Sequence, residues 1–194
     1  MNKLLIAATL TGLSLSAFAA EADAFAQVVN QEIAVKSGQK ILIASDSGKL
    51  NIKTSESGVL SYRVEFVKNQ TGWLDFGPKP TQKDFDECTA IYTEEKGLKI
   101  HTGNGLNAIV IVSVPAKNAL DVQLASGVLV VGPRSGKVDA FIGSGTLEYD
   151  AAELPAGTCV TATINAGTVK NQRDFNCASV GAVLHGQSGL ITVK

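Results

Sequence analysis

The chain has 194 residues, with 17 Lys and Arg against 18 Asp and Glu, and hydrophobic residues make up 45% of it. This near balance excludes a strongly basic surface for nucleic acid, and no block of like charges indicates a polyelectrolyte partner. The length suits one domain with a substantial core, and 19 Gly against 5 Pro predict many short turns rather than disorder.

The first residues have the features of a secretory signal peptide. A positive start at residues 1–3 is followed by an apolar run from residue 4 to about residue 15, and Ala17 and Ala19 give the small-x-small pattern that signal peptidase requires. The run is shorter than the roughly 20 apolar residues of a membrane-spanning helix. We expect cleavage after Ala19, export to the periplasm, cell surface or extracellular space, and no membrane span in the mature chain.

Residues 20–194 are expected to form a single all-β domain, because apolar and polar residues alternate along most of this region. Only residues 22–30 have a pattern that predicts one or two helical turns. Longer strands are expected at residues 58–67, 90–92, 98–101 and 107–114, and the Gly-Asn-Gly at 103–105 predicts a hairpin turn.

The last third of the chain contains a repeat that is centred on a glycine. Its copies are spaced 18, 22 and 22 residues apart, at Gly127, Gly145, Gly167 and Gly189. Apolar residues recur at fixed offsets, and five positions before the glycine stand Val122, Ala140, Ala162 and Leu184. Gly48 is the centre of an earlier copy at residues 41–52.

Fixed offsets place equivalent residues above one another, with a glycine where each strand bends. We therefore predict a single-stranded parallel β-solenoid, right-handed like most parallel crossovers, with an N-terminal region of longer β-strands and the clearest repeats over residues 119–194. A series of antiparallel hairpins is the alternative, but its turns would not keep fixed offsets.

Three cysteines follow the predicted cleavage site, so at least one thiol is left without an intramolecular partner. Cys159 and Cys177 are the preferred pair, because they are close in sequence and lie on neighbouring repeats, and an exported chain meets an oxidising compartment. The alternative is that Cys88, Cys159 and Cys177 all remain reduced and buried.

The aromatic residues Trp73 and Phe76, in the segment 69–80, are the best candidates for partner binding, because aromatic loops beside a rigid scaffold often bind sugars or proteins. The alternative is that they cap an open end of the core, as solenoids require. Asp121 and Asp139 share one offset and could form a short acidic row, for which a solvated face is favoured over a cation site.

No catalytic, cofactor-binding or metal-ligating residues are predicted. The two histidines, His101 and His185, are isolated and stand in no metal-binding motif, and no nucleophile elbow or phosphate-binding loop occurs. At equal offsets, Glu148 and Lys170 predict a cross-strand ion pair on an exposed face.

The last residues, 190–194, read as a strand that continues to the end of the sequence. An unpaired edge is expected there, and the last repeat then offers a surface for self-association or for a partner.

The strand at residues 109–115 that ends in proline, the segment 120–122, and the Ala-Ser-Gly turn at 125–127 with its repeats resemble the bacterial putative-adhesin domain family. The resemblance extends from about residue 41 to residue 194, and the segment 68–86 departs from the simplest pattern. It implies an exported β-solenoid of mostly unassigned function and supplies no site residues.

These observations favour a non-enzymatic, adhesin-like scaffold that binds an envelope or extracellular protein or glycan. The alternative is a structural periplasmic module that assembles with another envelope protein. An enzyme that acts on polysaccharide is a third possibility, but it would need convergent carboxylates, and the repeat offers only Asp121 and Asp139 on one face.

Overall fold

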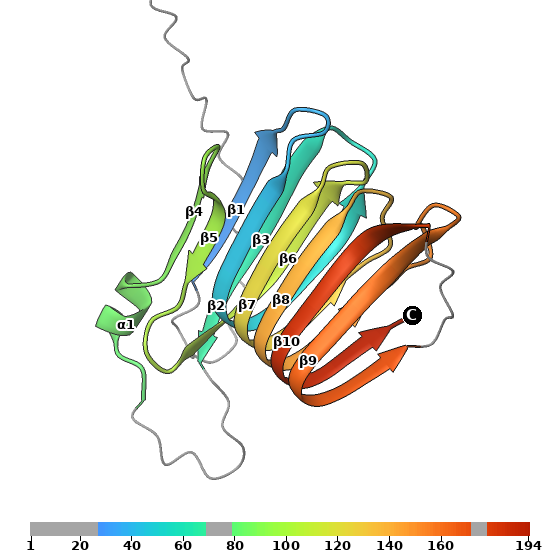
Figure 1. The fold of residues 1–194 in the computed structure, drawn as a ribbon. Helices are drawn as coiled ribbons and strands as arrows, with labels where there is room; N and C mark the ends of the chain where they lie inside the picture. The colour runs from blue at the N-terminus through green and yellow to red at the C-terminus, as the bar shows by residue number, and fades with distance from the viewer. Residues whose placement is uncertain (1–26, 69–78, 172–177) are drawn as a thin grey trace, which may run out of the picture.

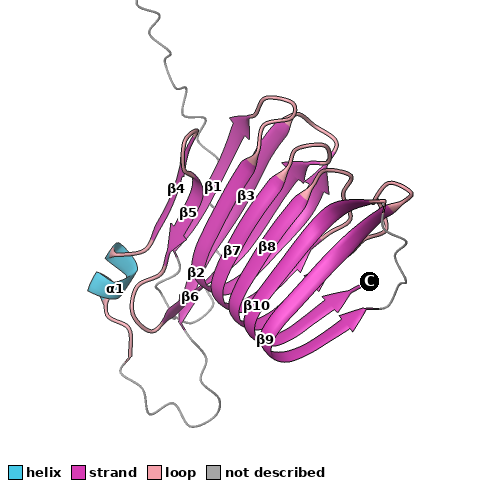
Figure 2. Cartoon of the chain, viewed as in Figure 1, coloured by secondary structure: helices cyan, strands magenta, loops and turns pink. Residues whose placement is uncertain are grey.

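The computed structural model describes residues 27–68, 79–171 and 178–194, and these residues form an all-β fold with one short helix (Figure 2). Ten strands make one mixed sheet in the order β1-β3-β6-β2-β7-β8-β10-β9, with β5 beside β2 and β4 beside β5. The elements are β1 (Gln27–Ala34), β2 (Ile41–Ser55), β3 (Val59–Lys68), α1 (Gln82–Asp86), β4 (Thr89–Thr93), β5 (Gly97–His101), β6 (Leu106–Pro115), β7 (Leu120–Val131), β8 (Val138–Tyr149), β9 (Thr158–Asn171) and β10 (Ser179–Val193).

Strands β2, β7, β8, β10 and β9 lie side by side, run parallel and share one register, and we call them the stack (Figure 1). Each strand bends partway along its length (Figure 1). Its one glycine with positive φ divides it into a first arm before the bend and a second arm after it. The predicted column is present, in the spatial order Val122, Ala140, Leu184, Ala162.

The bend requires glycine for two reasons. Gly145 has φ 123°, a conformation that other residues rarely adopt. A Cβ at this position would also lie 1.9 Å from the carbonyl oxygen of Gly127 on the next strand. A side chain here would therefore force the neighbouring backbones apart.

The core lies on the inner side of both arms. Alternate residues point inward along each arm, because successive side chains of a strand point to opposite faces. In β8, Ala140 and Ile142 before the bend and Leu147 after it are all 0% exposed. The inward residues of both arms belong to one hydrophobic cluster that also includes β3 and β6.

The spatial order of the last two strands differs from their order in the sequence. β10 lies between β8 and β9, and it pairs in parallel with both. Glu148 and Lys170 are consequently on strands that do not touch, so the predicted ion pair between them is wrong. Glu148 instead accepts a 2.8 Å hydrogen bond from Lys194, and this ion pair raises the pKa of Lys194.

The prediction of an unpaired edge in the last repeat, at residues 190–194, is wrong for the same reason. Because β10 is paired on both sides, the self-association surface that was expected there is already occupied by this chain's own strands. The outer edge of the stack belongs to β9.

On its other side, the stack continues through two short strands. β5 pairs with the first arm of β2, and β6 pairs with the second arm, and both run parallel to β2. The turn at residues 103–105 therefore joins strands that run in the same direction, and the predicted hairpin there is wrong. Ala108 stands opposite Gly48, so β5 and β6 together form one more copy of the repeat, with an insertion at the bend.

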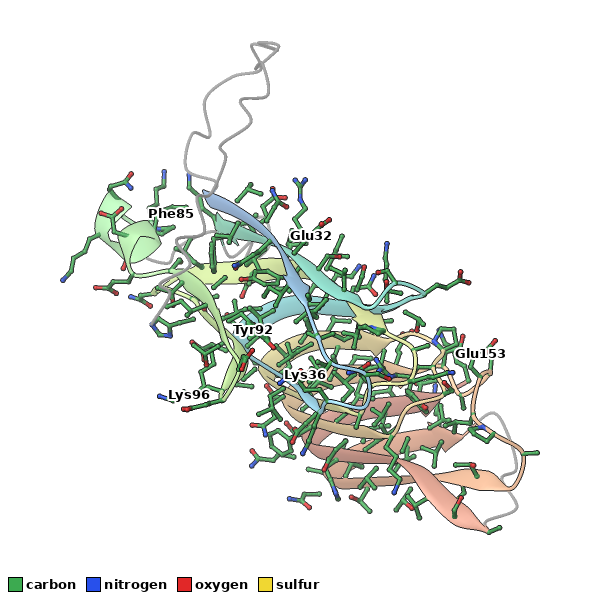
Figure 3. All side chains as sticks on the ribbon, turned by 90° about the horizontal axis from the view of Figure 1, so that it is seen from above. Glu32, Lys36, Phe85, Tyr92, Lys96 and Glu153 are labelled. Carbon is green, nitrogen blue, oxygen red and sulfur yellow. The ribbon has the colours of Figure 1, made fainter. Side chains whose placement is uncertain are left out.

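Antiparallel strands form this end of the sheet. β3 pairs antiparallel with β6, and β1 pairs antiparallel with β3. Residues 27–30 belong to β1, so the predicted helical turn over 22–30 is wrong for its described part, because pairing with β3 outweighs a weak local helical pattern. Helix α1 lies beside β4 and buries Phe85, which is 3% exposed (Figures 1 and 3).

A buried polar cluster ties the loops together at the arm ends opposite the bends. The Asn118 side-chain amide donates to the carbonyl oxygens of Lys36 and Gln39, both at 2.8 Å. Arg134, 1% exposed, donates through Nη2 to the carbonyl oxygens of Pro115 and Asn118. Burial lowers the pKa of Arg134 to about 10, and it raises the pKa of Tyr149, which interacts with Arg134, to about 12.

Candidate partner-binding surface

The outer face of the first arms carries a continuous row of non-core side chains. These residues alternate with the buried ones, and the strand register brings them into line. The row runs across β5, β2, β7, β8, β10 and β9 through Lys99, Ala44, Gln123, Phe141, His185 and Thr163.

A shallow groove lies in this row where β5, β2, β7 and β8 meet. It is lined by the side chains of Asp46, Lys99, His101, Gln123, Ala125 and Phe141. Ala44 and Ala125 are too small to fill the space beside Phe141, and the next outward position on β8 is Gly143. The ring of Phe141 is therefore only partly covered, and one wall of the groove is aromatic.

The opposite wall holds a fixed pair of polar side chains. Nδ1 of His101 lies 2.5 Å from Oδ2 of Asp46, and the backbone N–H of Thr102 donates to the same oxygen at 3.3 Å. Both side chains are more than half exposed, at 61% for His101 and 53% for Asp46. The pair is thus oriented by its own contacts while its remaining polar atoms face solvent.

The groove continues toward the tip of the β4–β5 hairpin, where Lys96 projects from the molecule (Figure 3). Lys99 and Gln123 line both parts, and Asp121 lines the far part. Asp121 accepts a 2.7 Å hydrogen bond from Lys40, and this contact raises the pKa of Lys40. The ammonium group of Lys99, the carboxylate of Asp121 and the amide of Gln123 therefore line the same part of the groove.

The acidic row that the sequence predicted is present, since Asp121 stands opposite Asp139 in the register of β7 and β8. Asp121 forms an ion pair with Lys40. Over residues 27–68, 79–171 and 178–194, no three His, Cys, Asp or Glu side chains converge in a way that could hold a metal ion. Within the same ranges, no helix has the length and apolar character needed to cross a membrane.

Other predicted site residues fall partly outside the described chain. Trp73, Phe76 and Cys177 lie outside the described residues, so partner binding by the two aromatics and the Cys159–Cys177 bridge stay predictions. Cys159 is buried at 2% exposure. Cys88 is a free, buried thiol that accepts a 3.3 Å hydrogen bond from the N–H of Gly103, and burial raises its pKa.

A second hollow lies at the bends, between the ends of β3 and β6 and the glycines of β2 and β7. Gly48, Gly127, Asn107 and Lys68 are among its lining residues. Lys68 is the last described residue before position 79. This hollow thus borders a limit of the described chain, whereas none of the residues that line the groove around Phe141 stands at such a limit, and the groove is the better-defined candidate.

The sequence analysis did not find this groove, although a signal for it was present. Four positions before the aligned glycines stand Ala44, Gln123, Phe141, Thr163 and His185, and these positions face outward. A phenylalanine at an outward position, with only Ala125 and Gly143 at the next outward positions of β7 and β8, is the pattern that would have indicated a surface site. The contact of His101 with Asp46 needed the β2–β5 pairing, which the interrupted repeat concealed.

Comparison with known proteins supports the architecture. The fold resembles the crystal structure of a putative cell adhesion protein from Clostridium sporogenes, with a TM-score of 0.50 and 14% sequence identity over 87% of this chain and 99% of that one. A putative adhesin from Parabacteroides distasonis aligns over 86% of this chain and 97% of its own, with 10% identity and a TM-score of 0.25, which is too low to carry an argument. No protein-family model matches the sequence. No curated protein matches it significantly either.

The Clostridium sporogenes protein shares the fold with this chain, and at 14% identity the similarity extends no further. A bacterial protein described as a putative cell adhesion protein is thus a structural neighbour of this chain, in agreement with the resemblance in the sequence. Any binding role must be argued from the surface itself.

Proposed function

We propose that this protein is an exported, non-enzymatic, adhesin-like scaffold that binds an envelope or extracellular partner through the groove beside Phe141. The single observation that carries the proposal is the partly exposed Phe141 ring on a flat sheet face, opposite the fixed Asp46–His101 pair. Aromatic side chains with neighbouring polar groups are the usual anchors of binding surfaces.

The scaffold suits this role because its strands are held on both sides. The parallel pairing of β2, β7 and β8 and the column of bend glycines support a single-stranded solenoid, whose right-handed sense follows from the general preference. A surface on such strands is set before a ligand arrives, so little conformational entropy is lost on binding.

Export is supported by the sequence at residues 1–19 and by the name of the structural neighbour, which is described as a putative cell adhesion protein. The periplasm, the cell surface and the extracellular space all agree with these observations. In each of these compartments, glycans and envelope proteins are available as partners.

The experiment compares the wild-type protein with Phe141→Ala in binding to immobilised cell-envelope polysaccharide and, separately, to envelope protein extract. The matched control is Ile111→Ala, which removes a side chain that is 36% exposed on β6, outside the groove. We expect Phe141→Ala to weaken binding by about tenfold or more and the control to leave it unchanged.

Two outcomes would count against the groove. Equal binding by the wild type and Phe141→Ala would remove it as the site, and loss of binding only in Trp73→Ala would move the site to the predicted aromatic loop. Failure of the wild type to bind either fraction would instead favour a purely structural module.

A further inference from the structure

The outer edge of β9 is unsatisfied within the described chain. β9 pairs only with β10, so one row of its backbone N–H and C=O groups has no strand beside it among residues 27–68, 79–171 and 178–194. Such an edge is a ready template for a further strand, and soluble proteins normally protect it.

The core is also open at this edge. Val160, Ala162 and Ile164 are only partly buried, and Val169 is 37% exposed. The equivalent residues of β8 are fully enclosed, since Val138 is 3% exposed and Ala140, Ile142 and Leu147 are 0% exposed. The missing cover is therefore one layer of apolar side chains in the same columns.

The edge lacks the charges that usually prevent association. No Asp, Glu, Lys or Arg occurs between Glu153 and Lys170, and this uncharged segment contains nearly all of β9. By contrast, β1 at the other edge of the sheet carries the exposed Glu32 near its centre (Figure 3). Two copies of β9 can thus approach each other without like-charge repulsion.

We propose that a second copy of this chain docks on β9, strand against strand, and closes a two-fold dimer. The first arm of β9 is self-complementary about Ala162. In an antiparallel pair centred there, each Val160 faces the partner's Ile164, and each Thr161 faces the partner's Thr163. Apolar side chains then extend the core columns across the interface, and hydroxyl groups meet on the outer face.

The same features favour a copy of this chain over a different partner. A charged ligand would find no group of opposite charge along the edge of β9. A second, identical strand has the same length and the same alternation of apolar and hydroxyl side chains. Because each copy uses its own β9 edge to cover the β9 edge of the other, association through β9 pairs two molecules and then stops, as an isologous interface requires. The dimer does not depend on the groove beside Phe141.

The test is sedimentation equilibrium of the protein over a wide concentration range, after expression of the full chain and processing by the host. We expect a monomer–dimer equilibrium in the wild type. Ala162→Lys, which brings two like charges together at the centre of the interface, should raise the dimer dissociation constant by about tenfold or more.

Two further variants make the result specific. Thr161→Lys places the charge at an exposed outward position on β9 that cannot disturb the core, and it should also weaken the dimer. Asn30→Lys places the same charge on the exposed edge strand β1 and should leave the dimer unchanged.

Hydrogen exchange gives an independent measurement, since amides of β9 should become more protected as the dimer forms. The proposal is overturned by a wild type that stays monomeric at its highest soluble concentration. It is also overturned by open-ended polymers, or by a dimer that resists Thr161→Lys but is weakened by Asn30→Lys.

Discussion

Strands β8 and β9 carry the same pattern of residues and experience different surroundings. Ile142 and Ile164 occupy equivalent positions, three residues before the bend glycine, and both point inward. Ile142 is enclosed by strands on both sides and is 0% exposed, whereas Ile164 is half-buried at the outer edge. The repeat therefore determines which way a side chain points, and the position in the stack determines how much that side chain stabilises the fold.

The largest difference between the two strands is expected at the bend. Gly145→Ala combines a strained φ of 123° with a contact of 1.9 Å to the backbone of Gly127, and strands on both sides prevent relief. Gly167→Ala meets a similar contact of 2.0 Å to Gly189, but the edge strand can move outward. We expect a loss of at least about 4 kcal/mol for Gly145→Ala and about 2 kcal/mol for Gly167→Ala.

Urea denaturation of both bend variants at low protein concentration measures this difference. Gly58→Ala is the matched control, because Gly58 has no positive φ and no atom lies within 4 Å of its added Cβ. Equal losses for the two bend variants would show that the outer edge is as constrained as the interior.

A smaller difference is expected in the core. Ile142→Ala leaves a cavity between two strands and should cost about 3 kcal/mol, while Ile164→Ala removes a side chain that is still partly in water and should cost about 1 kcal/mol. The measurement is again the free energy of unfolding in dilute solution. If the cost of Ile164→Ala rises with protein concentration, the edge is being covered by a second copy.

The smallest effect is expected at Tyr149, an inward residue of β8 that is 0% exposed. Its hydroxyl has no hydrogen-bond partner among the described residues, so Tyr149→Phe should raise stability at neutral pH by up to about 1 kcal/mol. Burial raises the pKa of Tyr149 from 10.0 to about 12 in the folded state, which means that folding favours the neutral phenol.

The preference of the fold for the neutral Tyr149 phenol therefore contributes fully to the free energy of unfolding below the unfolded pKa of 10.0. This contribution is lost as pH rises through the folded pKa of about 12. The stability advantage of Tyr149→Phe over the wild type should grow across this window. Parallel alkaline stability curves would contradict the buried, unpaired position of the hydroxyl.

Much of the stack could be predicted from the sequence, because glycine spacing and apolar offsets report directly on the bends and on the inward columns. The neighbours of Ala140 show that the same pattern does not predict the spatial order of the strands. Both Ala162 and Leu184 fit the next place in the column, and only the structure shows that Leu184 occupies it. Strand order depends on how the loops cross, and equal offsets are compatible with either order.

The candidate groove was harder to predict for a related reason. The copy of the repeat formed by β5 and β6 has Ala108 in place of the bend glycine and an insertion at the bend, so its register could not be aligned. Without that register, His101 could not be placed beside Asp46. Trp73 stood out as a binding candidate, with core capping as its alternative, because an aromatic loop is visible in the local sequence. Phe141 becomes a site only through its neighbours on other strands.

The insertion of β10 between β8 and β9 also has a consequence for how the chain acquires its structure. β9 is made before β10, yet β10 is its only described strand partner. β9 cannot add to the sheet before β10 has been made, because β10 is the strand it must lie against. Removal of residues 179–194 would therefore release two strands rather than one, and β9 must stay unpaired until the strand that follows it has formed.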